Sequence, residues 1–140
     1  MSDQTQLPRG IRNQNPCNIR HSAAFEWRGE GDPDPEGFCT FGSAVLGLRA
    51  ALILFHNYQE LYKLNTLEEL ISRWAPAIEN DVTAYIRYVA ADLAISPLSP
   101  VSVATIALPL LAAVVSYENG QNPYSLSIYA QAKQLAFSER

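Results

Sequence analysis

The chain is poor in charged residues and rich in hydrophobic ones. Charged residues make up 17% of its 140 residues, hydrophobic residues make up 48%, and the formal net charge is −4. This composition is not that of a disordered chain, and the length fits a single domain, residues 1–140, with one core. The acidic balance argues against a nucleic-acid partner, because a basic face is needed to neutralise phosphates.

Long hydrophobic runs are also missing. The start, MSDQTQLPRG, has neither a basic leader nor an apolar core, so we expect a protein made in the cytoplasm without a signal peptide. The most apolar stretch, residues 101–115, is too short for a comfortable membrane span, and Pro109 interrupts it. We therefore expect no membrane span, and we expect Pro109 in the first turn of a buried helix or at a kink.

The scarcity of histidine and cysteine excludes several kinds of site. The histidines are His21 and His56, and the cysteines are Cys17 and Cys39, whose spacing is not a zinc pattern. No metal or cofactor is predicted, and the cysteines are expected to be free, partly buried thiols, with a disulfide as the alternative in an oxidising compartment. Neither a G-x-S-x-G motif nor a glycine-rich phosphate loop is present, so carboxylate chemistry remains.

Helical periodicity dominates the chain after residue 42. Apolar residues recur at three- and four-residue steps, Ser43 is a suitable N-cap, and Thr66 to Glu69 form a capping box. The predicted helices cover approximately residues 43–64, 66–74, 80–93, 110–117 and 125–137.

The first forty residues have a different pattern. Residues 1–24 are predicted to form an extended arm whose arginines are either solvated or in contact with acidic cell-wall polymer. Two alternating runs flank the turn segment GEGDPDPEG, which predicts a β-hairpin over residues 25–41. Its carboxylates lack the spacing of an EF-hand, so a solvated loop is favoured over a Ca²⁺ site. The sequence thus predicts an α+β fold, mainly α, with a helical lobe over 43–137 and a small β-hairpin lobe.

Two glutamates are candidates for carboxylate chemistry. Glu118 directly follows the apolar run LLAAVVSY, a setting that supplies the partial burial and raised pKa of a general acid. The alternative is a surface carboxylate at a helix end. Glu79 lies near a helix start, where the helix dipole favours the ionised form, so it suits a base or a cap.

Residues 118–127, ENGQNPYSLS, resemble the catalytic-glutamate signature of soluble lytic transglycosylases and goose-type lysozymes. Asn119 stands where this signature usually has Ser, and Ser125 where it usually has Ala. Residues 41–89 are similar to a later part of the same fold. Because the two segments occur in inverted order, the resemblance implies a circularly permuted, lysozyme-like helical domain. The matching residues are Glu118, Asn122, Pro123 and Ser127 in the first segment, and Trp74, Val82 and Tyr85 in the second.

The N-terminal half carries a broader resemblance. The run RGIRNQNPCNIR, followed by W-x-G, GFCTF, GLRA and RWAP, is similar to a family of small phage-encoded virion or lysis proteins. Their opening usually reads RGIRNNNPGNIR, so Gln14 and Cys17 depart from it.

These resemblances imply cleavage of peptidoglycan glycan strands by a muramidase or a lytic transglycosylase. Glu118 would protonate the bridging oxygen, and either Glu79 would hold a water or the 6-hydroxyl of the substrate would attack. The residues implied in substrate binding are Asn80, Tyr85 and Asn122 for N-acetyl groups, and Trp27, with Trp74, for stacking on sugar rings.

The expected place of action is the periplasm and cell wall, in phage lysis or entry or in interbacterial killing, or a virion that carries the protein. Virion proteins or an inhibitor protein are further expected partners. The alternatives are a non-catalytic virion structural protein on a lysozyme-like scaffold and a helical adaptor without a site.

Overall fold

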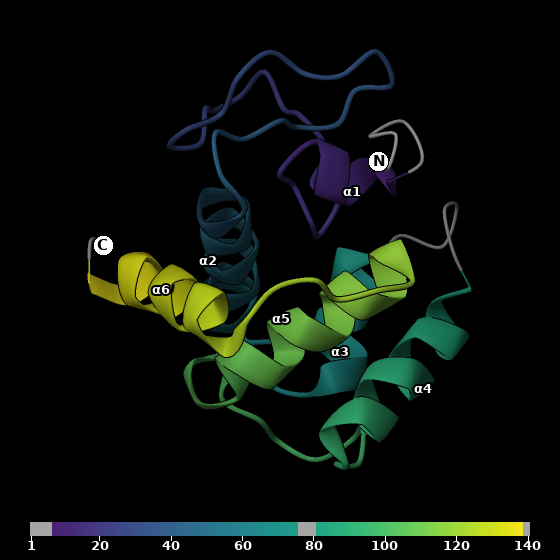
Figure 1. Ribbon diagram of the computed structural model, residues 1–140. Helices are drawn as coiled ribbons and strands as arrows, with labels where there is room; N and C mark the ends of the chain where they lie inside the picture. Colours follow the sequence, from purple (N-terminus) through teal and green to yellow (C-terminus); the bar gives the residue numbers. More distant parts are fainter. Residues whose placement is uncertain (1–6, 76–80, 139–140) are drawn as a thin grey trace.

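Helices make up most of the structure. The computed structural model describes residues 7–75 and 81–138, and six helices follow one another within them (Figure 1). The fold is therefore mainly α, and no sheet forms among these residues. The helices are α1 (Arg9–Arg12), α2 (Ala44–Tyr62), α3 (Leu67–Trp74), α4 (Val82–Leu93), α5 (Val103–Asn119) and α6 (Leu126–Ser138).

The five long helices are those that the sequence predicts, and local capping chemistry sets their ends. Ser43, Thr66, Asp81 and Ser102 each accept a hydrogen bond from a backbone N–H in the first turn of the helix that follows. One half of the predicted capping box forms, because the Glu69 N–H donates to the Thr66 hydroxyl at 3.2 Å. The Glu69 carboxylate accepts from the Asn65 N–H at 2.9 Å and from the Thr66 hydroxyl at 3.2 Å.

Helix α5 differs from its prediction because it is continuous. Pro109 lies inside one helix that begins six residues earlier, so it is not in a first turn, and the alternative of a kink at this residue stays a prediction. Its ring is exposed, so water can reach the carbonyl that loses its helical partner. As predicted from its apolar sequence, α5 packs centrally and contacts α1, α2, α4 and α6 (Figure 1). None of the described helices meets the length and hydropathy needed for a transmembrane segment.

The predicted extended arm is a folded segment. Residues 9–12 form α1, and Asn15, Cys17 and Ile19 are buried. The amide of Asn15 donates to the carbonyls of Ile19 and Cys39, each at 3.0 Å. These hydrogen bonds connect the two segments where no regular β-sheet ladder forms. The segment packs so closely on α2 that a Cβ at Gly47 would lie 2.3 Å from a backbone oxygen. Sequence patterns missed this packing because buried side-chain amides leave no periodic signal.

The predicted β-hairpin over residues 25–41 is also corrected. Residues 38–41 do not pair with residues 25–28. They pair with Arg20 on one side and Glu30 on the other, through the isolated bridges Arg20–Phe38 and Glu30–Phe41. Residues 37–41 therefore lie between residues 19–21 and residues 30–31 without forming a regular sheet, in the looped region above α2 in Figure 1. Both cysteines are free, as predicted, although both are fully buried in this packing.

Candidate functional site

Glu118 lies in the last turn of α5, where two other parts of the chain meet it. The phenol of Tyr85, on α4, donates to Oε2 at 2.7 Å. The amide Nδ2 of Asn18, in the N-terminal segment, donates to Oε1 at 3.0 Å. Both oxygens of the carboxylate are thus oriented by fixed donors, and a group that reacts with Glu118 meets a carboxylate held in one position.

Tyr85 is suited to remain a donor. It is fully buried, and its ring stacks on Tyr117 with 3.8 Å between the ring centroids. Burial and the adjacent Glu118 carboxylate raise the pKa of the Tyr85 phenol far above its usual range. Burial first, and Glu118 second, also raise the pKa of the Cys17 thiol, which therefore stays protonated. Cys17 is consequently not a nucleophile at this site.

The N-terminal segment is anchored to α5 next to this carboxylate. The buried amide of Asn119 donates to the carbonyl of Pro16 at 2.8 Å and to that of Val115 at 2.9 Å. Gly10 sits so close that a Cβ there would lie 2.7 Å from the Asn119 side chain. This contact fixes Asn18 against Glu118, so the geometry of the carboxylate depends on the folded N-terminal segment.

Glu118 lines an open groove with a volume of about 610 Å³. Within the part of the chain that the structure describes, Glu118 is the one carboxylate in its lining. The groove therefore combines a single oriented carboxylate with aromatic faces and cationic side chains. The aromatic lining residues are Phe25, Phe38, Tyr58 and Trp74, and the cationic ones are Arg9, Arg20 and Arg73.

The arginines are held over aromatic rings. The guanidinium carbons of Arg9 and Arg20 each lie 4.4 Å from the centroid of the Phe38 ring, and Arg9 also pairs with Glu36 at 2.8 Å. Of the arginines in the N-terminal segment, these two line the groove.

A second hollow continues the groove. It has a volume of about 680 Å³ and shares Phe25, Leu54, Tyr58 and Arg73 with the first. Trp27, predicted to stack on a sugar, is half-buried and lines this second hollow, where its ring meets Phe25 edge to face at 5.0 Å between centroids. The two hollows adjoin through these shared residues.

The remaining predicted site residues divide into two groups. Glu79 and Asn80 lie outside the described residues, so their assigned roles stay predictions. Asn122 is exposed in the connection between α5 and α6, where its side-chain oxygen accepts from the Tyr129 hydroxyl and from the Tyr124 N–H. It is not among the groove-lining residues, and its role as a substrate contact also stays a prediction.

Sequence reasoning missed several residues of the groove. The sequence around Asn18 predicts only a turn-rich arm, whereas in the structure Asn18 has a left-handed backbone, with φ of 54°, and its amide donates to Glu118. Tyr58 and Arg73 lie at the ends of different helices, and no local motif connects them. Their aromatic and guanidinium side chains are of the kinds that bind ligands, but the sequence does not show that they line the same groove.

No known family model matches the chain. It is 37% identical to Protein P5 of Pseudoalteromonas phage PM2 over 121 residues, which cover 84% of this chain and 74% of that protein. The aligned part is most of both proteins, and it supports the predicted relationship to phage-encoded proteins. The chain belongs to the family of Protein P5 of Pseudoalteromonas phage PM2.

Proposed function

We propose that this protein cleaves the glycan strands of peptidoglycan, with Glu118 as the general acid. The observation that carries the proposal is the position of Glu118 on the wall of an open groove lined by aromatic rings and arginines. A carboxylate sealed inside the core would have favoured a purely structural role. Sugars bind proteins by stacking on aromatic faces, and four such side chains line the groove around this carboxylate.

The proposed reaction begins with a proton on Glu118. This proton moves to the glycosidic oxygen between N-acetylmuramic acid and N-acetylglucosamine as the bond from that oxygen to the anomeric carbon breaks. The anomeric carbon is then attacked by a water or by the 6-hydroxyl of the same sugar. The proton that the attacking oxygen loses returns to a carboxylate, which is Glu118 itself in the second route. Glu79, predicted to position the water, serves the first route.

The charges of the groove fit this substrate. Arg9, Arg20 and Arg73 line a surface on which a strand with carboxylate-bearing peptide stems would lie. The adjoining hollow with Trp27 adds further aromatic surface on which sugars of the strand would stack. The glutamate-bearing helix α5 follows α2, α3 and α4 in the chain, the order implied by a circularly permuted lysozyme-like domain.

Mass spectrometry of sacculus fragments tests the proposal and separates the two routes. Purified protein is incubated with sacculi, and the released muropeptides are compared with those from a no-protein control. Reducing muramic ends indicate hydrolysis by a muramidase, 1,6-anhydro ends indicate a lytic transglycosylase, and reducing glucosamine ends indicate a glucosaminidase, which would correct the position of cleavage. Intact strands after incubation with sacculi of several bacterial types would contradict the proposal.

A non-catalytic virion structural protein is the second candidate. It is favoured by the engagement of both Glu118 oxygens in hydrogen bonds within the chain, to Asn18 and Tyr85. In that case the carboxylate would tie the N-terminal segment to α4 and α5 without reacting. Replacement of Glu118 would then reduce stability, and wild-type protein would release no fragments.

A further inference from the structure

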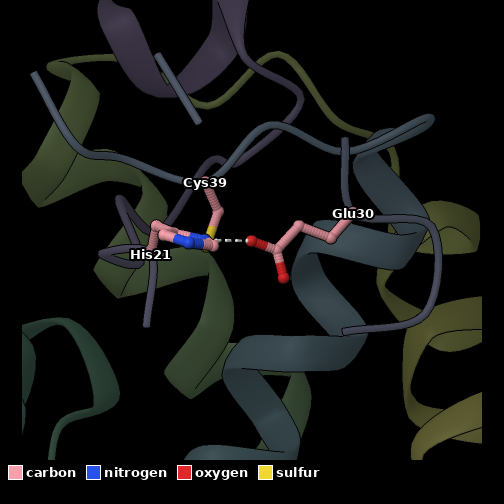
Figure 2. Close-up of side chains that lie close together, drawn as sticks. All are labelled: His21, Glu30 and Cys39. Carbon is pink, nitrogen blue, oxygen red and sulfur yellow. Dashed lines mark hydrogen bonds and ion pairs between the residues drawn. The ribbon is translucent and has the colours of Figure 1, made fainter. Parts of the chain in front are cut away.

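A second cluster of reactive side chains lies in the irregular region before α2. The ligand atoms that His21, Glu30 and Cys39 offer all lie within 4.8 Å of one another. Figure 2 shows the three side chains pointing toward a common centre from three different segments. None of the three lines the groove that contains Glu118, so this cluster is separate from the proposed site of cleavage.

The backbone holds the three segments together around this cluster. The Cys39 N–H donates to the Ile19 carbonyl and the His21 N–H to the Gly37 carbonyl, both at 2.9 Å. The Glu30–Phe41 bridge fixes the third segment. The buried Asn15 amide, which bonds the carbonyls of Ile19 and Cys39, supports two of these segments from beneath. The backbone positions of the three donor residues are thus set by the fold.

The side chains of the cluster are oriented toward one another, and the cluster is open to solvent on one side. The side chain of Glu30 is only 2% exposed, and its Oε1 accepts from the Trp27 N–H at 2.9 Å. Its Oε2 points toward the centre of the cluster and lies 2.8 Å from Nδ1 of His21. A ligating carboxylate is typically oriented in this way by an outer hydrogen bond. Cys39 is fully buried, whereas the His21 side chain is 37% exposed, so solvent reaches the cluster from the histidine side.

We propose that His21, Glu30 and Cys39 bind a zinc ion. Imidazole, carboxylate and thiolate are three of the ligands that zinc takes, and the thiolate selects against magnesium and calcium, which prefer oxygen donors. Metal–ligand bonds of about 2.0–2.3 Å require movements on the order of 1 Å from the present positions. Three protein ligands leave a fourth tetrahedral position on the exposed histidine side for a water.

The metal would add to the contacts that hold the irregular region before α2. In the described part of the chain, residues 13–43 contain no helix, no sheet and no disulfide. A bound ion would connect all three of its segments, and the free energy of metal binding would add to the stability of the folded state. Phe38 and Arg20, which line the groove, are the direct neighbours of two ligands, so the ion would also support that wall. The proposal itself does not depend on the cleavage activity.

Sequence patterns gave no metal site here. His21 and Glu30 are nine residues apart, as are Glu30 and Cys39, and this spacing belongs to no common zinc motif. The donors meet only because of the irregular pairing of residues 19–21 and 30–31 with residues 37–41.

Cobalt substitution tests the proposal with a readout that does not involve activity. The full-length protein is stripped with a chelator, dialysed, and titrated with Co²⁺ and with Zn²⁺. We expect about one equivalent to bind, with a sulfur-to-cobalt charge-transfer band in the near ultraviolet. Zinc should displace the cobalt and raise the melting temperature, and Mg²⁺ should do neither.

Variants identify the ligands. Cys39→Ser should lose the charge-transfer band, and His21→Gln should weaken zinc binding by more than about tenfold. Cys17→Ser is the matched control, because Cys17 is also a buried free thiol but lies outside the cluster, and it should keep the band. If Cys39→Ser fails to fold, the exposed His21→Gln variant and the zinc response of the wild type decide the question. A wild type without the band, or with a melting temperature unchanged by zinc, would overturn the proposal, and so would a band lost in Cys17→Ser but kept in Cys39→Ser.

Discussion

The phenol of Tyr85 donates a 2.7 Å hydrogen bond to Oε2 of Glu118 and so joins α4 to the last turn of α5. The two residues are 33 positions apart. Tyr85, which the sequence predicts as a contact for an N-acetyl group, is fully buried and does not line the groove, so that role stays a prediction. Asn18 donates to the other oxygen of the same carboxylate. The relationship connects the fold of the chain directly to the proposed chemistry.

Removal of the Tyr85 hydroxyl should affect both stability and the pH range of cleavage. Tyr85→Phe keeps the stacked ring but leaves Oε2 of Glu118 without this donor, which we expect to cost about 1–3 kcal/mol in the free energy of unfolding. The ionised carboxylate loses support, so the decline of cleavage activity at alkaline pH should move to higher pH.

Chemical denaturation and a pH–rate profile on sacculi measure these two effects. Tyr88→Phe is the control, because Tyr88 is 40% exposed and also packs on Tyr117. Equal losses in the free energy of unfolding of the two variants would show that the hydrogen bond to Glu118 does not contribute to stability.

The anchor between α5 and the N-terminal segment should depend on Asn119. Asn119→Ser shortens the side chain, so the bond to the Pro16 carbonyl is lost, at an expected cost of about 1–3 kcal/mol. Hydrogen exchange should become faster in residues 9–19, whereas exchange in α2 should change little. The exposed Gln121→Ser serves as the control. Unchanged exchange in residues 9–19 would show that the segment is held mainly by other contacts.

The sequence predicts the helices, including α5, but not the packing of the segment before α2. Apolar periodicity and capping residues predict the five long helices because these signals are local, and they place Glu118 at the end of a buried helix. The segment around Asn15 and Asn18 is held by buried amides and left-handed residues, which form no periodic pattern. The contact between Asn18 and Glu118 spans 100 positions, and only the folded chain brings its members together.

Asp34 should make stability depend on pH in the acid range. Burial acts to raise the pKa of its carboxyl, but hydrogen bonds from the Phe38 N–H, the Asn13 amide and the Glu36 N–H, together with Arg9, outweigh it and hold the pKa below its usual range. A lowered pKa in the folded state means that the stabilisation is complete above the unfolded-state pKa of about 3.9 and is lost as the pH falls below that value.

Thermal unfolding across this pH range tests the contribution of Asp34. Asp34→Asn should be less stable than wild type at neutral pH, and the difference should shrink as the pH falls through the acid range. Glu36→Gln changes an exposed partner of Arg9 and should leave the curve close to that of the wild type. A neutral-pH difference that persists unchanged into acid would assign the loss to packing instead of charge.

Arg73 should contribute to substrate binding and not to the chemical step. It lies 3.8 Å from the centroid of the Tyr62 ring and lines both hollows of the groove. Arg73→Ala should raise the KM for soluble glycan strands by about three- to tenfold with kcat nearly unchanged. Arg73→Lys, which keeps the charge, should recover part of the loss. Arg87→Ala, exposed on α4 and absent from both linings, is the control. A fall in kcat at constant KM would contradict this role.

Glu118 is proposed to donate the proton that cleaves the glycan. The most direct measurement is the rate of muropeptide release from sacculi by purified Glu118→Gln, compared with wild type and with Glu60→Gln, an exposed glutamate on α2 outside the groove. Circular dichroism and thermal unfolding verify that each variant is folded. We expect Glu118→Gln to slow release by roughly 10²–10⁴-fold and Glu60→Gln to match the wild type. A folded Glu118→Gln variant that releases muropeptides at the wild-type rate would show that Glu118 is not the general acid.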